Sequence, residues 1–149
     1  MKRIALLTVF VTAAAVTMVA QAKPNFSGTW VVVSPAEAAG QEEQVRHTDT
    51  TLSTGHESEG GGHSATYKLD GSESRNELTS HGEKIVTLSK ALWDGNKVVI
   101  TSSTTYPDGR TLDSKQTWSM GSDGRLTIEM TQTMTGQPAQ SMTLVHRKK

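Results

Sequence analysis

The chain has 149 residues with 15 basic and 15 acidic side chains, so its formal net charge is zero, and it contains no cysteine. The charge balance argues against nucleic-acid binding, which favours a basic face. Without cysteine there is neither a disulfide framework nor a residue for lipid attachment, so packing and sheet hydrogen bonds must stabilise the fold.

Residues 1–22 have the three parts of a secretory signal peptide. Lys2 and Arg3 form the basic start, an apolar run follows, and Ala20-Gln21-Ala22 supplies small residues at the two positions that a signal peptidase recognises. The alternative, an uncleaved anchor, would need a longer apolar span. We therefore expect cleavage before Lys23, export to the periplasm or the medium, no stable membrane insertion afterwards, and one domain over 23–149.

The first part of this domain has an uneven pattern. Residues 25–30 open a first strand, whereas 45–54 alternates poorly. Residues 63–69 form a predicted strand with Ala65, Tyr67 and Leu69 on one face, and 75–79 form a short one. The composition of 53–62, with three consecutive glycines, indicates a flexible loop, which we interpret as a plain connection rather than a lid at a barrel mouth.

Asp-Gly pairs, which are strong hairpin signals between alternating runs, mark the turns of the second part. They stand at Asp70-Gly71, Asp94-Gly95, Asp108-Gly109 and Asp123-Gly124. Their spacing predicts strands of roughly nine to eleven residues with short turns, as in an up-and-down meander.

Strict alternation from residue 86 onward assigns the two faces of these strands, because successive side chains point to opposite sides. Even positions carry the apolar residues and odd positions are mostly Thr, Ser, Lys and Glu. The even set is Val86, Leu88, Leu92, Val98, Ile100, Tyr106, Leu112, Trp118, Met120, Leu126, Ile128, Met130, Met134, Met142 and Leu144. We expect this set to form the core.

Turn chemistry predicts the register of the hairpins. A three-residue loop that ends in a left-handed glycine pairs positions of equal parity, and 107–109, 122–124 and 94–96 all fit such a loop. The pairs that follow are Val98 with Trp118, Ile100 with Gln116, Ser102 with Ser114, Trp118 with Ile128, Gln116 with Met130, Ser114 with Gln132, and Leu92 with Val98. All three loops thus keep the apolar residues on one side.

The predicted inner face also carries polar side chains. They are Lys90, Ser102, Ser114, Gln116 and Gln132. An unsatisfied buried polar group costs about 1–3 kcal/mol, so these groups need partners, water or a cavity. Barrels of about eight strands can hold a small ligand among such groups. A half-open sheet whose upper rows meet solvent explains them equally well, and both interpretations stay open.

The opening Asn25-Phe26-Ser27-Gly28-Thr29-Trp30, together with 67–74 and the 93–96 hairpin, resembles small secreted bacterial lipocalin-like proteins. A Gly-x-Trp at this point is similar to the start of lipocalin and avidin barrels, in which the tryptophan closes the barrel end. The resemblance implies an all-β, antiparallel lipocalin-like barrel or half-barrel of about eight strands, with Trp30 structural and Arg147 as the arginine paired with it. Avidin-like biotin contacts cannot be mapped onto this chain.

Metal and catalytic motifs are weak. His56, Glu57, Glu59 and His63 are close in sequence, but their spacing matches no compact zinc motif and the neighbouring glycines give poor preorganisation, so we predict no metal and no cofactor. No Gly-x-Ser-x-Gly elbow, phosphate-binding glycine loop or His-Glu-x-x-His motif occurs, so we do not expect an enzyme.

Our hypothesis is non-catalytic binding or carriage of a small, partly apolar ligand inside the barrel, with a small lipophilic compound as partner and no nucleic acid. The predicted ligand-binding residues are Leu88, Lys90, Leu92, Ile100, Ser102, Gln116, Trp118, Met130 and Gln132. The main alternative is a structural or protein-interaction module with a filled core and an exposed sheet edge. An outer-membrane barrel is disfavoured because the chain lacks aromatic girdles and ends Arg147-Lys148-Lys149.

Overall fold

The computed structural model describes residues 22–56, 63–80 and 82–149. The described chain forms ten antiparallel strands and one short 3-10 helix, η1 (Ala36–Ala38). The strands are β1 (Gly28–Ser34), β2 (Glu42–His47), β3 (Thr51–His56), β4 (His63–Lys68), β5 (Ser74–Ser80), β6 (Glu83–Asp94), β7 (Lys97–Thr105), β8 (Thr111–Met120), β9 (Leu126–Met134) and β10 (Gln140–Lys148).

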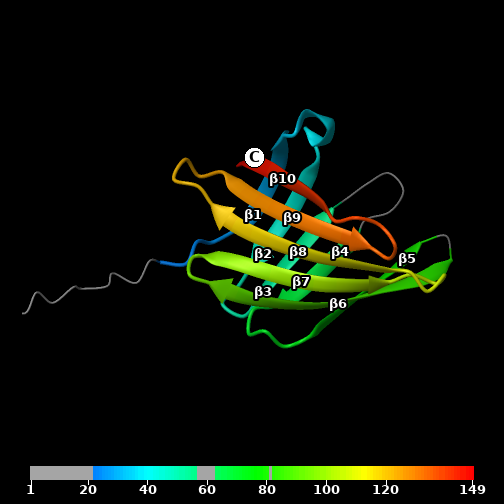
Figure 1. The fold of residues 1–149 in the computed structure, drawn as a ribbon. Coiled ribbons are helices and arrows are strands. Elements are labelled where there is room, and N and C mark those ends of the chain that lie inside the picture. Colours follow the sequence, from blue (N-terminus) through cyan, green and yellow to red (C-terminus); the bar gives the residue numbers. More distant parts are fainter. Residues whose placement is uncertain (1–21, 57–62, 81) are drawn as a thin grey trace, which may run out of the picture.

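These strands make one sheet in the order β4-β3-β2-β1-β10-β9-β8-β7-β6-β5, which curls into a nearly closed barrel (Figure 1). Neighbours in sequence are neighbours in the sheet, except that β1 pairs with β10 and the two ends of the sheet are β4 and β5. The antiparallel meander is confirmed. The expected number of about eight strands is wrong, because the poorly alternating stretch after residue 41 folds as two short strands of six residues each, β2 and β3.

Side chains close the seam between β4 and β5, where no strand ladder joins the described residues. The Thr66 N–H donates to Asn76 Oδ1 at 2.8 Å, and Asn76 Nδ2 donates back to the Thr66 carbonyl at 3.1 Å. Further along the seam, the Lys68 N–H donates to Ser74 Oγ at 2.9 Å. Asn76 therefore satisfies both polar groups of one backbone residue, as a neighbouring strand would.

Asn76→Ala is expected to loosen this seam. It leaves the Thr66 N–H and carbonyl without their partner, so the free energy of unfolding should fall by about 1–2 kcal/mol. Chemical denaturation measures the loss, and hydrogen exchange should show a faster-exchanging Thr66 amide. Thr79→Ala, at an exposed position of the same strand, is the control. If the Thr66 backbone amide exchanges at the same rate in Asn76→Ala as in the parent protein, the seam does not depend on the Asn76 side chain.

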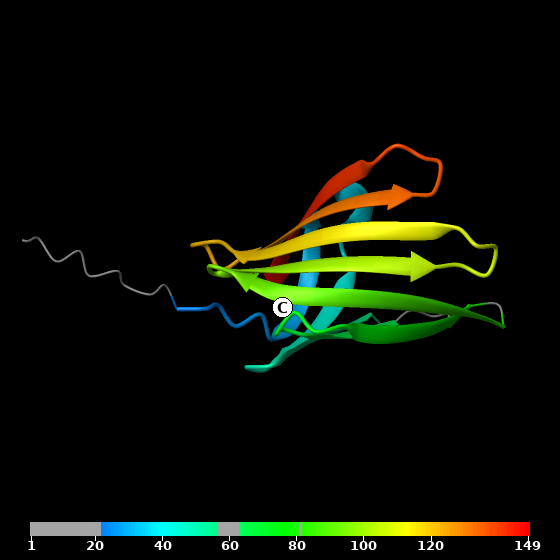
Figure 2. The same cartoon turned by 60° about the horizontal axis from the view of Figure 1, so that its bottom comes forward.

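The buried core lies toward one end of the barrel, which we call the closed end. Residues 22–27 lead into β1 at this end (Figure 2). Phe26 and Trp30 are buried there, and the Trp30 Nε1–H donates to the Phe26 carbonyl at 2.8 Å. Phe26 also meets the ring of Trp118 edge-on, with centroids 6.0 Å apart. The turns β7–β8 and β9–β10 extend from the opposite end (Figure 2).

A lysine, not the expected Arg147, covers Trp30. Lys148 is the strand partner of Trp30, and its Nζ lies 5.6 Å from the centre of the indole ring. Arg147 is exposed and pairs with Val31, so its side chain belongs to the other face. A Cβ built on Gly28 would approach Lys148 Cε to 2.5 Å, so the glycine provides the room through which the lysine reaches the tryptophan.

Two of the three predicted hairpin registers are confirmed. Strands β7 and β8 pair Val98 with Trp118 and Ile100 with Gln116, and β8 and β9 pair Gln116 with Met130. The third is wrong, since the β6–β7 turn has two residues, Gly95 and Asn96, between paired Asp94 and Lys97. Gly-Asn is itself a two-residue hairpin signal, and such a turn pairs odd with even positions.

This one-residue difference reverses the faces of β6. Ser89 and Ala91 are buried, whereas Leu88, Lys90 and Leu92 are exposed on the outer face. The prediction that Leu88, Lys90 and Leu92 point into the barrel is therefore wrong. The inner row at the closed end contains Trp93 in place of Leu92, opposite Val98.

The loop predicted over 53–62 is wrong in its first part. Residues 53–56 belong to β3, where Thr54 pairs with Val45 and Ala65. The remaining positions, 57–62, and with them Glu57 and Glu59, lie outside the described residues. The strands predicted over 63–69 and 75–79 are present as β4 and β5.

Candidate functional site

Six of the nine predicted ligand-binding residues lie on the inner face, on the wall built by β7, β8 and β9. Ile100 and Trp118 are buried, and the other four are half-buried. The six are Ile100, Ser102, Gln116, Trp118, Met130 and Gln132. Leu88, Lys90 and Leu92 are separated from them by the sheet.

The polar groups on this wall find partners among their neighbours. Ser102 Oγ lies 2.8 Å from Ser89 Oγ, and the Trp118 Nε1–H donates to Gln116 Oε1 at 3.0 Å. Gln132 Nε2 donates to Met130 Sδ at 2.9 Å. Because Gln116 and Gln132 remain half-buried, this wall also reaches solvent toward the open end of the barrel.

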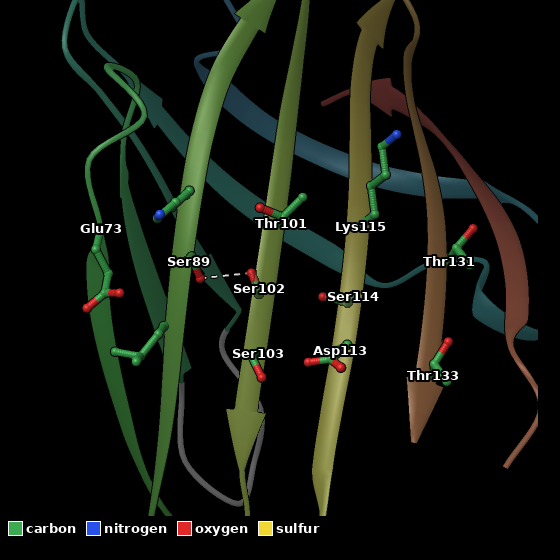
Figure 3. A pocket seen from close by; sticks show the side chains of 12 residues that line it. Glu73, Ser89, Thr101, Ser102, Ser103, Asp113, Ser114, Lys115, Thr131 and Thr133 are labelled. Carbon is green, nitrogen blue, oxygen red and sulfur yellow. Dashed lines mark hydrogen bonds between the residues drawn. The ribbon is translucent and has the colours of Figure 1, made fainter. Parts of the chain in front are cut away.

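A hollow of about 580 Å³ lies over the outer surface of β6 to β9, with Glu73 at its edge (Figure 3). Thr101, Lys115 and Thr131 form one of its rows, in ladder register across three strands. All three are exposed and have the parity opposite to that of the buried Ile100 and Trp118. Within the described residues no ion pair joins its charged side chains. We interpret this hollow as a shallow, solvated face of the twisted sheet.

A second, more enclosed pocket of about 260 Å³ is lined by residues of the five strands β2 to β6, on both sides of the seam between β4 and β5. Its walls combine carboxylates, small hydroxyl residues and apolar groups. They are formed by Glu43, Thr54, His56, Ser64, Ala65, Tyr67, Asn76, Glu77, Leu78 and Thr87. Thr87 Oγ1 lies 2.8 Å from Thr104 Oγ1, which links this wall to β7. We regard this pocket as the candidate functional site.

Glu43 is the central charged group of this pocket. It stands opposite Trp30 in the β1–β2 ladder, with its side chain only 27% exposed. Burial raises the pKa of Glu43, and the charge of nearby His56 works in the opposite direction. The pKa of Tyr67 is raised as well, first by burial and then by the charge of Glu43. Glu43 and Tyr67 thus share one weakly solvated environment.

His146 packs behind Glu43 from β10. Its Nε2 lies 4.0 Å from Glu43 Oε2, and the residue is 1% exposed. Its Nδ1 has no hydrogen-bond partner within the described part of the chain. Burial lowers the pKa of His146, although the neighbouring Leu126 backbone opposes this effect. The neutral imidazole is therefore favoured, and it supplies no positive charge to Glu43.

Stability should depend on pH through Glu43. Its pKa is raised in the folded state, so above the ordinary value of 4.5 the folded protein keeps a proton that the unfolded chain has lost. The contribution of Glu43 to the free energy of unfolding must then fall as the pH rises through this window. Replacement by glutamine removes the effect, so Glu43→Gln should gain stability over the parent protein as the pH rises from acid to neutral. Denaturant titrations at several pH values measure this difference.

Glu37→Gln, which removes an exposed carboxyl on η1, controls for the loss of one negative charge. A stability difference between Glu43→Gln and the parent that stays constant with pH would contradict the assignment of a burial-raised pKa to Glu43. The opposing effect of His146, whose lowered pKa makes stability fall as the pH drops below its ordinary 6.5, is present in both proteins.

The described residues contain no group of three or more His, Cys, Asp or Glu side chains placed to hold a metal ion. They also contain no helix long and apolar enough to cross a membrane. Comparison with known protein families and with curated proteins finds no match for this chain.

The residues of the enclosed pocket come mostly from the first half of the chain, where alternation is poor, so the sequence pattern does not reveal them. Glu43, Val45 and His47 do alternate, but with polar residues on the inner face, so the apolar signal of a strand is absent. Asn76 carries no sequence signal for closing a seam. The alternation of Ala65 and Tyr67 was visible, and extending it across the sheet would have pointed to this wall.

Proposed function

We propose that this protein is an exported, lipocalin-like barrel that binds or carries a small, partly apolar ligand in its interior without transforming it. The observation that supports this most is the enclosed pocket of about 260 Å³, in which the apolar groups of Ala65, Tyr67 and Leu78 lie beside polar and charged side chains. Such a combination is typical of small-molecule sites, in which apolar contacts supply affinity and polar groups supply orientation.

Two further features favour the barrel interior over its surface. The closed end is packed by Phe26 and Trp30, so a ligand has a floor against which to settle. The opposite wall offers the half-buried Gln116 and Met130 rather than a filled core. A purely structural barrel gains nothing from keeping such groups accessible, because a packed interior is more stable.

Tryptophan fluorescence tests this proposal directly. A titration of the mature protein with a panel of small lipophilic compounds should give a saturable change for at least one of them. Gln116→Leu, which removes the acceptor of the Trp118 Nε1–H, should weaken that response several-fold. Lys115→Leu, the adjacent residue on the outer face, should leave it unchanged.

A response that never saturates, or a saturable response that is weakened by Lys115→Leu on the outer face, would contradict interior binding. The protein would then be better described as a structural or protein-interaction module that acts through its surface or a sheet edge.

A further inference from the structure

Charge is distributed unequally around the enclosed pocket. Among the residues that the structure describes, two carboxylates, Glu43 and Glu77, line it, and neither a lysine nor an arginine does so. Glu77 already has two cationic partners, since Arg75 Nε lies 2.9 Å and Lys84 Nζ 2.6 Å from its carboxylate oxygens. These ion pairs are exposed and lie on the rim, so Glu77 has little need of a further partner.

Glu43 is in the opposite situation. Within the described residues its carboxylate accepts no hydrogen bond, and the basic group within 4.0 Å of it is the imidazole of His146, whose pKa is lowered by burial and whose neutral form supplies no charge. The other titratable groups that influence it are His56 on β3 and Tyr67 on β4, of which the phenol carries no positive charge. The His56 Nδ1–H is directed to the Glu42 carbonyl at 2.8 Å. A weakly solvated carboxylate of this kind gains most from a cation brought by a ligand.

We propose that the pocket binds a small organic cation, a protonated amine with a compact apolar body, whose ammonium group pairs with Glu43. This inference rests on the proposed function and specifies its ligand class. Ala65, Leu78 and the ring of Tyr67 contact the apolar body, and Asn76 and Thr54 offer hydrogen-bonding groups beside it. The volume lies below the roughly 300–1,000 Å³ of drug-sized sites, which selects a small ligand.

The pairing has a clear energetic basis. An ammonium that enters the pocket replaces the water that Glu43 has lost and forms a charge-assisted hydrogen bond, which is about twice as strong as a neutral one. A carboxylate ligand of the same shape meets two negative charges instead. A neutral alcohol keeps the apolar contacts but loses the ionic gain. Amine, alcohol and carboxylate should therefore bind in that order.

Calorimetric titration of the mature protein with hexylamine, hexanol and hexanoate, and with 2-phenylethylamine and 2-phenylethanol, tests this order at mildly alkaline pH. We expect at least one amine to bind about tenfold or more tightly than its alcohol. Glu43→Gln, which is nearly isosteric, should lower the affinity for that amine about tenfold and leave the alcohol unchanged. Glu37→Gln, remote on η1, should change neither.

Equal affinities for amine and alcohol, or an amine affinity that survives Glu43→Gln, would overturn the cation proposal while leaving interior ligand binding intact. Binding of hexanoate in preference to hexylamine would overturn it as well. If none of the five compounds binds, the cation proposal fails, and the fluorescence panel of lipophilic compounds then decides separately on the proposed function. Circular dichroism of Glu43→Gln confirms that the variant is folded before its affinity is interpreted.

Discussion

Trp30→Ala should lower the free energy of unfolding by about 3–5 kcal/mol, the cost of removing a large aromatic side chain from a packed core. Trp30 is 1% exposed, and its Nε1–H bond fixes the N-terminal segment at the Phe26 carbonyl. The variant loses packing and also leaves that carbonyl without its donor. Equilibrium denaturation followed by circular dichroism measures the loss.

Lys148→Met is the matched control, because it keeps the aliphatic stem over the indole and removes only the exposed charge near Trp30. It should cost less than about 1 kcal/mol. If Trp30→Ala lowers the free energy of unfolding by no more than Lys148→Met does, Trp30 does not stabilise the closed end of the barrel.

Ala65→Phe should abolish or weaken ligand binding by more than about tenfold. Ala65 lines the enclosed pocket from β4 and pairs with Thr54, which lines it from β3. A phenyl ring in place of the methyl group occupies space that a ligand must use, while the half-buried position lets the ring enter an existing hollow rather than displace core atoms. The affinity of the tightest-binding panel compound is the measurement.

Thr66→Phe is the control for this change. Thr66 is the next residue of β4, exposed on the outer face, and its backbone partners at the seam do not involve its side chain. Binding in Thr66→Phe should equal that of the parent protein. If Ala65→Phe binds the compound with the affinity of the parent protein, the ligand does not bind in this pocket.

Much of the fold could be predicted because local chemistry and the hydrophobic pattern agree in the second half of the chain. The turns 107–109 and 122–124 each end in a left-handed glycine, and both place the inner residues of β7, β8 and β9 correctly. Asp94-Gly95-Asn96 failed for a specific reason, because this sequence fits both a three-residue loop and a two-residue Gly-Asn turn. The three-residue loop places the apolar Leu88 and Leu92 on the inner face, so the hydrophobic pattern agrees with the wrong turn.

Leu92 shows why an apolar residue on the outer face is compatible with this fold. A Cβ added to Gly71 would come within 2.7 Å of Leu92 Cδ2, so the leucine lies directly against the turn that links β4 to β5. It thus has a packing partner outside the barrel. Alternation alone cannot reveal such a contact, because residues 71 and 92 become neighbours only in the folded chain.

The candidate site was less accessible to sequence reasoning than the fold. The wall of Gln116, Met130 and Gln132 follows from strand register, whereas Glu43 and Asn76 acquire their roles from long-range contacts across the barrel and its seam. Single-strand patterns contain no information on which strands meet when a sheet closes. The polar inner face of β2 further conceals its strand signal.

Native mass spectrometry of the protein purified from the cells that naturally produce it tests interior binding most directly. We expect a folded species that carries a small molecule, which is lost under mild collisional activation and is absent from Ala65→Phe prepared in the same way. Ligand carriage would be contradicted if the parent protein is detected only at the mass of its own chain and binds no compound of the lipophilic or amine panels.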